Sequence, residues 1–254
     1  MGTDLILRRQ DLITNPTPRV PICLVLDASG SMSEVVEGSF ERTGQTYYKD
    51  NQQWEIVTGG TTRLTLLNEG VKLFFNELFN DEVAKYSAEI SVIAFAGTAE
   101  TIMDFESLSR VHFIELSEMA QDGTNIGDGV KLALKLLENR KKEYQDAGVD
   151  YFQPWLVLMT DGKPTEDNYK DIAQDVKKLV LDKRLTVFPI GVGDGADMQV
   201  LALFSPKRPP LKLKGLRFKE FFEWLSKSVA ATSQSTPGEN IILDTEGIQG
   251  WGEL

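Results

Sequence analysis

A carboxylate and two hydroxyls alternate in the segment Asp27-Ala28-Ser29-Gly30-Ser31, which directly follows a short apolar run at residues 20–26. A run of this length and composition is typical of a buried strand in a parallel sheet that is covered on both faces. In open α/β sheets, ligands bind where the strands reach their carboxyl ends. Small oxygen donors on such a loop suit a hard cation, Mg²⁺ or Mn²⁺, better than zinc or copper. The segment therefore predicts a cation site at the end of the first strand.

Two later loops carry side chains that could complete this site. Thr124 lies in the loop 122–125, just before an amphipathic helix that we expect to start at Ile126, and Asp161 follows a second buried run at residues 155–160. If both apolar runs are parallel strands of one sheet, these loops converge at its carboxyl edge. The candidate metal residues are Asp27, Ser29, Ser31, Thr124 and Asp161.

The same hydroxyls have a purely structural interpretation. Serine and threonine are common in loops and at helix N-caps, which alone would account for Ser29, Ser31 and Thr124. Thr61 and Thr62 are rival candidates for the threonine of the site. We discount them because they precede the first predicted helix rather than the second.

Strands and helices alternate along the chain, which indicates an α/β fold with a doubly wound sheet. We expect a mostly parallel six-stranded sheet with one antiparallel edge strand and helices on both faces. The apolar and alternating patterns predict strands at residues 20–26, 88–95, 100–105, 155–160, 185–191 and 209–213, and helices at residues 63–79, 126–140, 167–182, 197–203 and 218–230.

The segment 34–62 interrupts this alternation after the first strand. Two β-prone runs, 45–49 and 53–57, flank the turn-prone pair Asp50-Asn51, which predicts an inserted hairpin near the metal loop. Its apolar side chains have two interpretations that the sequence leaves open: a surface that binds a partner, or packing against the edge of the domain. These side chains are Tyr47, Tyr48, Trp54 and Ile56.

Composition bounds the remaining possibilities. The chain has 254 residues, of which 41% are hydrophobic, enough for one domain with its own core. We place that domain at residues 18–231, after an N-terminal extension at 1–17 and before a Ser-, Thr-, Gly- and Pro-rich tail at 232–254, which we expect to pack loosely or stay mobile. The net charge of −11 argues against nucleic acid as a partner.

The single cysteine, Cys23, lies inside the first strand and is expected to pack in the core, a usage that suits a reducing compartment. Neither a signal peptide nor a membrane span is expected from the apolar runs. We therefore expect a cytoplasmic protein with no membrane partner.

Enzymatic functions find little support in the sequence. The only histidine, His112, has no visible partner for a serine hydrolase, and no phosphate-binding loop of the Gly-x4-Gly-Lys-Ser/Thr type occurs. The best enzymatic alternative is a Mg²⁺-dependent phosphohydrolase that uses Asp27 as nucleophile with Asp161 nearby. Such a site would want a second acid two residues after the first, where this chain has Ser29.

The order Asp-x-Ser-x-Ser, then a threonine before a helix, then an aspartate after a buried strand resembles the metal-ion-dependent adhesion site of von Willebrand factor A (vWA) domains. The resemblance implies that Ser29, Ser31 and Thr124 contact the metal, and that Asp27 and Asp161 orient those ligands or bind directly. It also implies Mg²⁺, with Mn²⁺ and Ca²⁺ as alternatives. The expected function is a non-enzymatic protein-interaction module whose metal binds an Asp or Glu of a partner.

Further segments are similar to the TerY-like subgroup of vWA proteins. They are residues 190–194, Gly215-Leu216 with 218–225, and 235–238 ahead of a terminal Gly-Trp251. This resemblance implies a bacterial scaffold linked to tellurite resistance and stress response, whose partner is a kinase or phosphatase of the same operon. The insertion at 34–62 is larger than the short link expected in that subgroup.

Overall fold

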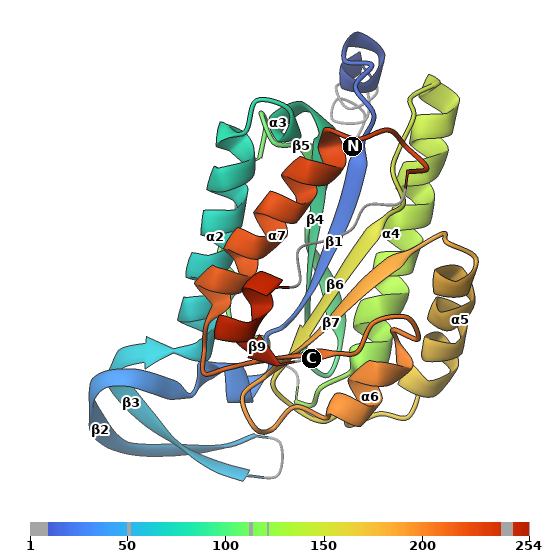
Figure 1. Ribbon diagram of the computed structural model, residues 1–254. Helices are drawn as coiled ribbons and strands as arrows, with labels where there is room; N and C mark the ends of the chain where they lie inside the picture. The colour runs from blue at the N-terminus through green and yellow to red at the C-terminus, as the bar shows by residue number, and fades with distance from the viewer. Residues whose placement is uncertain (1–9, 50–51, 112–113, 121, 240–245, 254) are drawn as a thin grey trace.

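The computed structural model describes residues 10–49, 52–111, 114–120, 122–239 and 246–253. Its centre is a seven-stranded sheet in the order β5-β4-β1-β6-β7-β8-β9 (Figure 1). The α/β fold with a mostly parallel sheet is therefore confirmed. The strands are β1 (Val20–Asp27), β4 (Ala88–Phe95), β5 (Ala99–Ser107), β6 (Trp155–Thr160), β7 (Thr186–Val192), β8 (Leu211–Leu213) and β9 (Gly252–Glu253).

The sheet has one more strand than predicted, and the extra strand comes from the tail. β5 is antiparallel to β4 as expected, and β9 is antiparallel to β8, so both edges of the sheet are antiparallel. Ile248 and Trp251 are buried beside β9, in the core cluster on one face of the sheet. The expectation that the tail packs loosely is wrong for this part of it, because two large apolar side chains anchor it.

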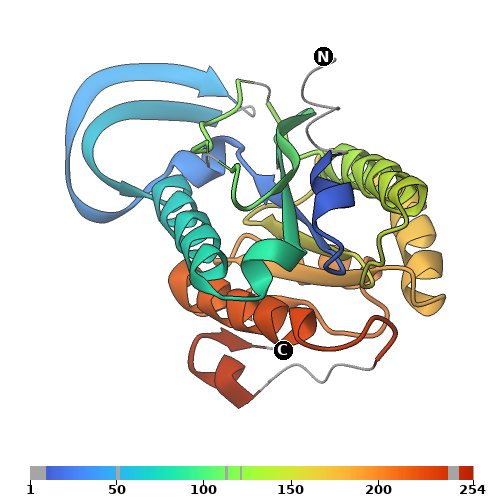
Figure 2. The ribbon, with the colours of Figure 1, turned by 90° about the horizontal axis from the view of Figure 1, so that it is seen from above.

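Helices cover both faces of the sheet (Figures 1 and 2). One face packs against α2 (Arg63–Asn80) and α7 (Phe218–Ser233), and the short α3 (Ala84–Ser87) lies beside them. The other face packs against α4 (Ile126–Ala147), α5 (Tyr169–Leu181) and α6 (Met198–Leu203).

The fully apolar run of β1 follows from this two-sided cover. Ile22, Leu24 and Leu26 point to the core under α2 and α7, whereas Cys23 and Val25 point to the core under α4. Cys23 packs in the core as predicted, and burial raises the pKa of its thiol to about 12.

The insertion forms a two-stranded antiparallel sheet of its own, β2 (Val35–Lys49) and β3 (Gln52–Thr62), which we call the arm. The arm projects from one end of the domain (Figures 1 and 2). Its predicted turn, Asp50-Asn51, lies outside the described residues. Tyr48 is 77% exposed, and Tyr47 and Ile56 are exposed as well, so these three side chains are not core of the domain edge, whereas Trp54 is half-buried.

A buried ion cluster lies at the amino end of the parallel strands. The Glu89 carboxylate, on β4, accepts hydrogen bonds from Arg19 Nε (3.1 Å), Arg140 Nε (2.7 Å) and the Tyr144 hydroxyl (2.5 Å). All four side chains are at least 97% buried. Because each charge has a partner, the cluster ties β4 to α4 and to the segment that leads into β1.

In the described part of the chain, no helix is both long enough and apolar enough to cross a lipid bilayer.

Candidate metal centre

Asp27 is the last residue of β1, and two hydrogen bonds hold its carboxylate in place. Its side chain is fully buried. The Oδ1 atom accepts a hydrogen bond from the Ser29 backbone N–H (2.9 Å), and Oδ2 accepts one from the Thr160 hydroxyl (2.5 Å). Asp27 therefore links the ends of β1 and β6, which are neighbours in the sheet.

The two serines lie on the loop after β1 and meet Asp161 from the end of β6. The Ser29 and Ser31 hydroxyl oxygens are 3.1 Å apart. The Ser31 hydroxyl donates to Asp161 Oδ1 (2.7 Å), a contact between residues 130 positions apart in the chain. The fold thus brings together Asp27, Ser29, Ser31 and Asp161 at the carboxyl edge of the sheet, where the sequence pattern predicted a site.

Thr124 reaches the same edge from the loop before α4. It is 7% exposed, and its backbone N–H donates to the Thr165 hydroxyl (3.0 Å) while its carbonyl accepts from the Thr165 N–H (3.2 Å). Its hydroxyl oxygen lies 3.5 Å from the place that a Cβ would take on Gly162, the residue after Asp161. That hydroxyl makes no hydrogen bond within the described residues, so it is a donor and acceptor without a structural task.

Helix capping does not account for these hydroxyls. The N-cap of α4 is Asn125, whose Oδ1 accepts from the Asp128 N–H (3.0 Å), and Ser29 makes no side-chain cap contact to the short 3-10 turn Gly30–Ser33. The capping interpretation of Thr124 is therefore wrong. The rival Thr62 is itself a cap, because its hydroxyl accepts from the Thr65 N–H at the start of α2 (3.1 Å).

Both carboxylates of the site carry charge at an electrostatic cost. Burial, and then the negative charge of Asp161, raise the pKa of Asp27 to about 6. Burial also raises the pKa of Asp161, against the opposing effects of its hydrogen bond from Ser31 and of the Arg63 charge. A divalent cation beside them would favour the ionised form of both. Two carboxylates and three hydroxyls form an all-oxygen set that fits such a cation.

The carboxylates alone do not make a metal site. Among the described residues there is no group of three or more His, Cys, Asp or Glu side chains that could hold an ion. A cation at this edge would therefore depend on the hydroxyl oxygens of Ser29, Ser31 and Thr124. The single histidine, His112, lies outside the described residues.

Three further residues take part in the site and were not identified from the sequence. Thr160 donates to Asp27, and its position directly before Asp161 is a signal that could have pointed to it. Arg63 Nη1 donates to the Ser31 carbonyl (2.8 Å), lies 3.5 Å from Asp161 Oδ2, and pairs with Glu34. Arg63 and Glu34 flank the arm in sequence. They meet at the metal loop because β2 and β3 pair along the arm and bring its two ends together.

Glycine at position 195 allows a close approach beside Asp161. A Cβ on this residue would lie 2.5 Å from the Asp161 carbonyl oxygen, which no real side chain tolerates. The segment between β7 and α6 can therefore lie directly against the loop that carries Asp161.

Solved structures with this fold come from several kinds of protein. The pilus adhesin SpaC of Lactobacillus rhamnosus GG aligns with a TM-score of 0.58 at 14% identity over 85% of this chain and 30% of that chain. Proximal thread matrix protein 1 from the mussel byssus, solved with a zinc-occupied MIDAS motif, aligns with a TM-score of 0.53 at 16% identity over 86% of this chain and 47% of that chain. The conserved hypothetical protein BatB from Bacteroides thetaiotaomicron aligns with a TM-score of 0.52 at 16% identity over 85% of this chain and 100% of that chain.

These likenesses show the fold alone, since the identities are low. This chain spans about half of the mussel protein's length and less than a third of the adhesin's. None of the curated protein sequences is similar enough to match the chain.

The sequence model of the von Willebrand factor type A domain matches residues 57–212, more than half of the chain. The match begins inside β3, so β1 and the Asp27–Ser31 loop lie outside it. In the sheet, however, β1 lies between β4 and β6, which both belong to the matched part. Strand order, cover by helices and sequence thus agree, and the chain belongs to the von Willebrand factor type A domain family.

Proposed function

We propose that this chain is a metal-dependent protein-interaction module. Ser29, Ser31 and Thr124 would hold a divalent cation, which we propose to be Mg²⁺, and Asp27 and Asp161 would orient these ligands and bound waters. The observation that carries the proposal is the approach of five side chains from three loops to one edge of the sheet. Two of them are buried carboxylates, and one is a hydroxyl that makes no hydrogen bond within the described part of the chain.

The donor set explains why such a site suits adhesion. Neutral hydroxyl ligands leave a bound cation short of negative charge, and carboxylates held behind them fix the geometry without fully neutralising it. When bound, the cation supplies a positive centre with an exchangeable position that accepts a carboxylate oxygen. We propose that a partner's Asp or Glu is that ligand, and Arg63 at the rim of the site adds a second positive charge.

We favour this function over the phosphohydrolase that uses Asp27 as nucleophile. The Asp27 side chain is fully buried, and each of its oxygens accepts a hydrogen bond, from Ser29 and from Thr160. A nucleophile must reach the phosphorus of its substrate, and here the carboxylate is enclosed by its own loop. A supporting residue of a metal site has no such need for access.

The choice of metal follows from the donor atoms, and the biological setting from the sequence resemblance. The mussel protein was solved with zinc in its MIDAS motif, whereas an all-oxygen site favours Mg²⁺, with Mn²⁺ and Ca²⁺ as alternatives. From the resemblance to the TerY-like subgroup we propose a bacterial, cytoplasmic scaffold in stress response or signalling, with a kinase or phosphatase as partner. The single cysteine of the chain, Cys23, is free, which suits that compartment.

Two measurements, made one after the other, test the proposal. Calorimetric titration of the full chain with Mg²⁺ should show one site, and Ser31→Ala should abolish it. Ser33→Ala should not, because this serine follows on the same loop and makes no hydrogen bond to the site among the described residues. Capture of the co-encoded kinase or phosphatase should then require Mg²⁺, fail in EDTA and fail for Ser31→Ala.

The two possible failures have different meanings. If Mg²⁺, Mn²⁺ and Ca²⁺ all fail to bind, the metal site is refuted. If a cation binds but capture ignores both EDTA and Ser31→Ala, the metal does not mediate the interaction. Hydrolysis of a phosphate ester that Asp27→Asn abolishes would instead establish the phosphohydrolase.

A further inference from the structure

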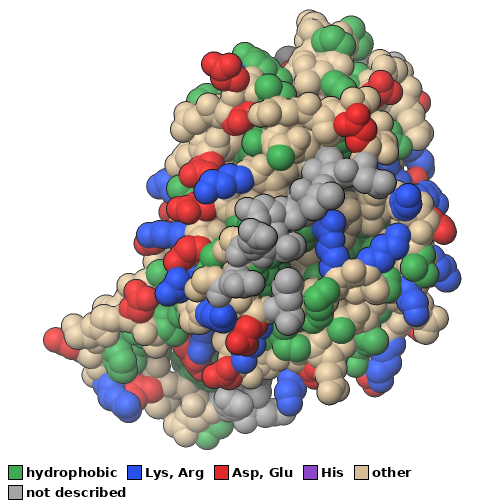
Figure 3. Space-filling model, in the orientation of Figure 1, with side chains coloured by type: hydrophobic (Ala, Val, Ile, Leu, Met, Phe, Trp, Pro, Cys, Tyr) green, Lys and Arg blue, Asp and Glu red, His purple; other side chains and the backbone are tan. Residues whose placement is uncertain are grey.

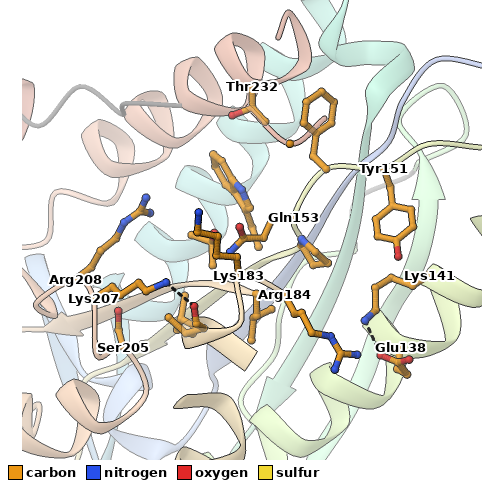
Figure 4. Close-up of a pocket in the computed structure, with 18 of the residues that line it drawn as sticks. Glu138, Lys141, Tyr151, Gln153, Lys183, Arg184, Ser205, Lys207, Arg208 and Thr232 are labelled. Atoms are coloured by element: carbon orange, nitrogen blue, oxygen red, sulfur yellow. Dashed lines mark hydrogen bonds and ion pairs between the residues drawn. The ribbon is translucent and has the colours of Figure 1, made fainter. Parts of the chain in front are cut away.

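A pocket of about 730 Å³ opens at the amino end of β6 and β7, at the opposite end of these strands from the metal centre (Figure 4). Its walls come from the ends of α4, α5 and α7, from the starts of the two strands and from the loop between α6 and β8. Enclosure by several elements and a volume of this size are typical of sites for small molecules.

The lining of the pocket is basic, although the chain as a whole is acidic. The described residues that line it include five Lys or Arg and two Glu, although the whole chain has a net charge of −11. Lys and Arg side chains gather on the corresponding side of the surface in Figure 3. The cations are Lys141, Lys183, Arg184, Lys207 and Arg208.

Three of these cations have a structural task. Lys141 pairs with Glu138 at 2.6 Å, and Arg184 lies near enough to the same carboxylate to help lower its pKa. Lys207 Nζ donates to the Val180 carbonyl (2.9 Å) at the end of α5, as a helix C-terminus favours. Lys183 and Arg208 have no carboxylate partner among the described residues. In Figure 4 their side chains extend in the same direction, toward Thr232 of α7.

Lys183 occupies a backbone position where glycine is the ordinary choice. Its φ is +57°, and within the described residues it is the only non-glycine residue with a positive φ. Its N–H bonds to the Val180 carbonyl (3.2 Å) and the Arg184 N–H to the Leu179 carbonyl (2.8 Å), which is the Schellman ending of α5. A lysine in this left-handed position destabilises the fold relative to glycine, so its side chain needs another explanation.

Arg208 is a second locally unfavourable residue in the same pocket. Its guanidinium carbon lies 5.0 Å from the centre of the Phe188 ring, and its Nη1 is buried without a hydrogen-bond partner among the described residues. Burial with no neighbouring carboxylate lowers its pKa. A buried, unpartnered guanidinium nitrogen destabilises the protein unless a ligand satisfies it.

We propose that this pocket binds the phosphate group of a small phosphorylated molecule between Arg208 and Lys183. A guanidinium fork and an ammonium from different elements suit a phosphate dianion, which matches their combined charge. The volume leaves room for the rest of the molecule. Locally unfavourable residues are expected at functional sites, and here two of them, Lys183 and Arg208, line one pocket.

The test uses the full chain in EDTA, so that the metal centre cannot contribute, and titrates it calorimetrically with phosphate, pyrophosphate and ATP. We expect binding that strengthens from phosphate to the larger ligands. Lys183→Gly and Arg208→Met should each weaken it at least tenfold. Both variants should unfold at the same or a higher urea concentration than the parent, because glycine suits the left-handed position and methionine still packs on Phe188 without an unpartnered nitrogen. Lys177→Gln, an exposed change on α5 outside the pocket, should bind as the parent does.

Absence of binding by all three ligands would overturn the proposal, and so would binding that both variants leave unchanged. A phosphoserine peptide that binds more tightly than pyrophosphate, with the same loss in Lys183→Gly, would overturn the assignment to a small molecule and make the pocket a docking site for a phosphorylated protein.

Discussion

Replacing Asp27 by asparagine should stabilise the metal-free protein at neutral pH. The asparagine keeps the size of the side chain and an oxygen that can accept from the Ser29 N–H, and the Thr160 hydroxyl can turn to accept from the new amide. The substitution removes a charge that is fully buried next to Asp161. In the parent protein, the buried charge of Asp27 therefore destabilises the folded state when no cation is bound.

The magnitude follows from the pKa of Asp27, which burial and then Asp161 raise from 3.8 to about 6. As pH rises between these values, the unfolded chain loses the proton first, so the stability of the folded protein falls. The loss is complete above the folded pKa and amounts to about 3 kcal/mol at pH 7.5, against about 1 kcal/mol at pH 4.5. Asp27→Asn should raise the free energy of unfolding by up to these amounts, which corresponds to roughly 6 °C in Tm at pH 7.5.

Urea unfolding in EDTA, followed by tryptophan fluorescence, measures the difference in stability between parent and variant at pH 4.5 and at pH 7.5. Adding Mg²⁺ at pH 7.5 should stabilise the parent and leave Asp27→Asn unchanged. The reasoning is refuted if the variant is less stable than the parent at pH 7.5 in EDTA, or if the difference between them does not change with pH.

Three further predictions concern residues beside the site and the buried ion cluster at the opposite end of the sheet. Arg63→Gln should tighten Mg²⁺ binding roughly 3- to 10-fold by calorimetry, because a positive charge near Asp161 is removed; an unchanged affinity, or the same gain in Arg63→Lys, would contradict this. Gly195→Ala should lower the free energy of unfolding by about 1–3 kcal/mol in urea, since its Cβ would overlap the Asp161 carbonyl. Glu89→Gln should lower it by about 3–5 kcal/mol, because two buried arginines lose the buried counter-charge that they share and keep only Asp11 and Glu143 as partners, and a change below about 1 kcal/mol would show the cluster to be dispensable.

The alternation of apolar runs and amphipathic segments was sufficient to predict most of the sheet. The expected bounds of the second parallel strand, 88–95, agree with β4, and those of the third, 155–160, agree with β6. Apolar runs of this kind are reliable because both faces of a central strand are buried. The convergence of the three loops then followed from the rule that parallel strands end at one edge.

Features that depend on contacts distant in sequence could not be predicted. Residues 252–253 are too few for a strand pattern, and β9 forms because Ile248 and Trp251 bury beside it. Arg140 lies in a highly charged stretch of α4 that is typical of a solvated surface, yet it is buried because Glu89 lies opposite it on the neighbouring β4. The position of Arg63 at the metal loop depends on the arm closing on itself, and the arm's length gives no hint of that.

The closure of the arm also makes it separable from the domain. The Arg63 N–H donates to the Glu34 carbonyl at 3.3 Å, so the chain leaves the body and returns to it at one point. A protein in which a short turn replaces residues 35–62 should keep all seven strands of the sheet and the loop that follows β1. Natural variation in the length of such an insert would then alter how far the molecule reaches without disturbing the framework beneath it.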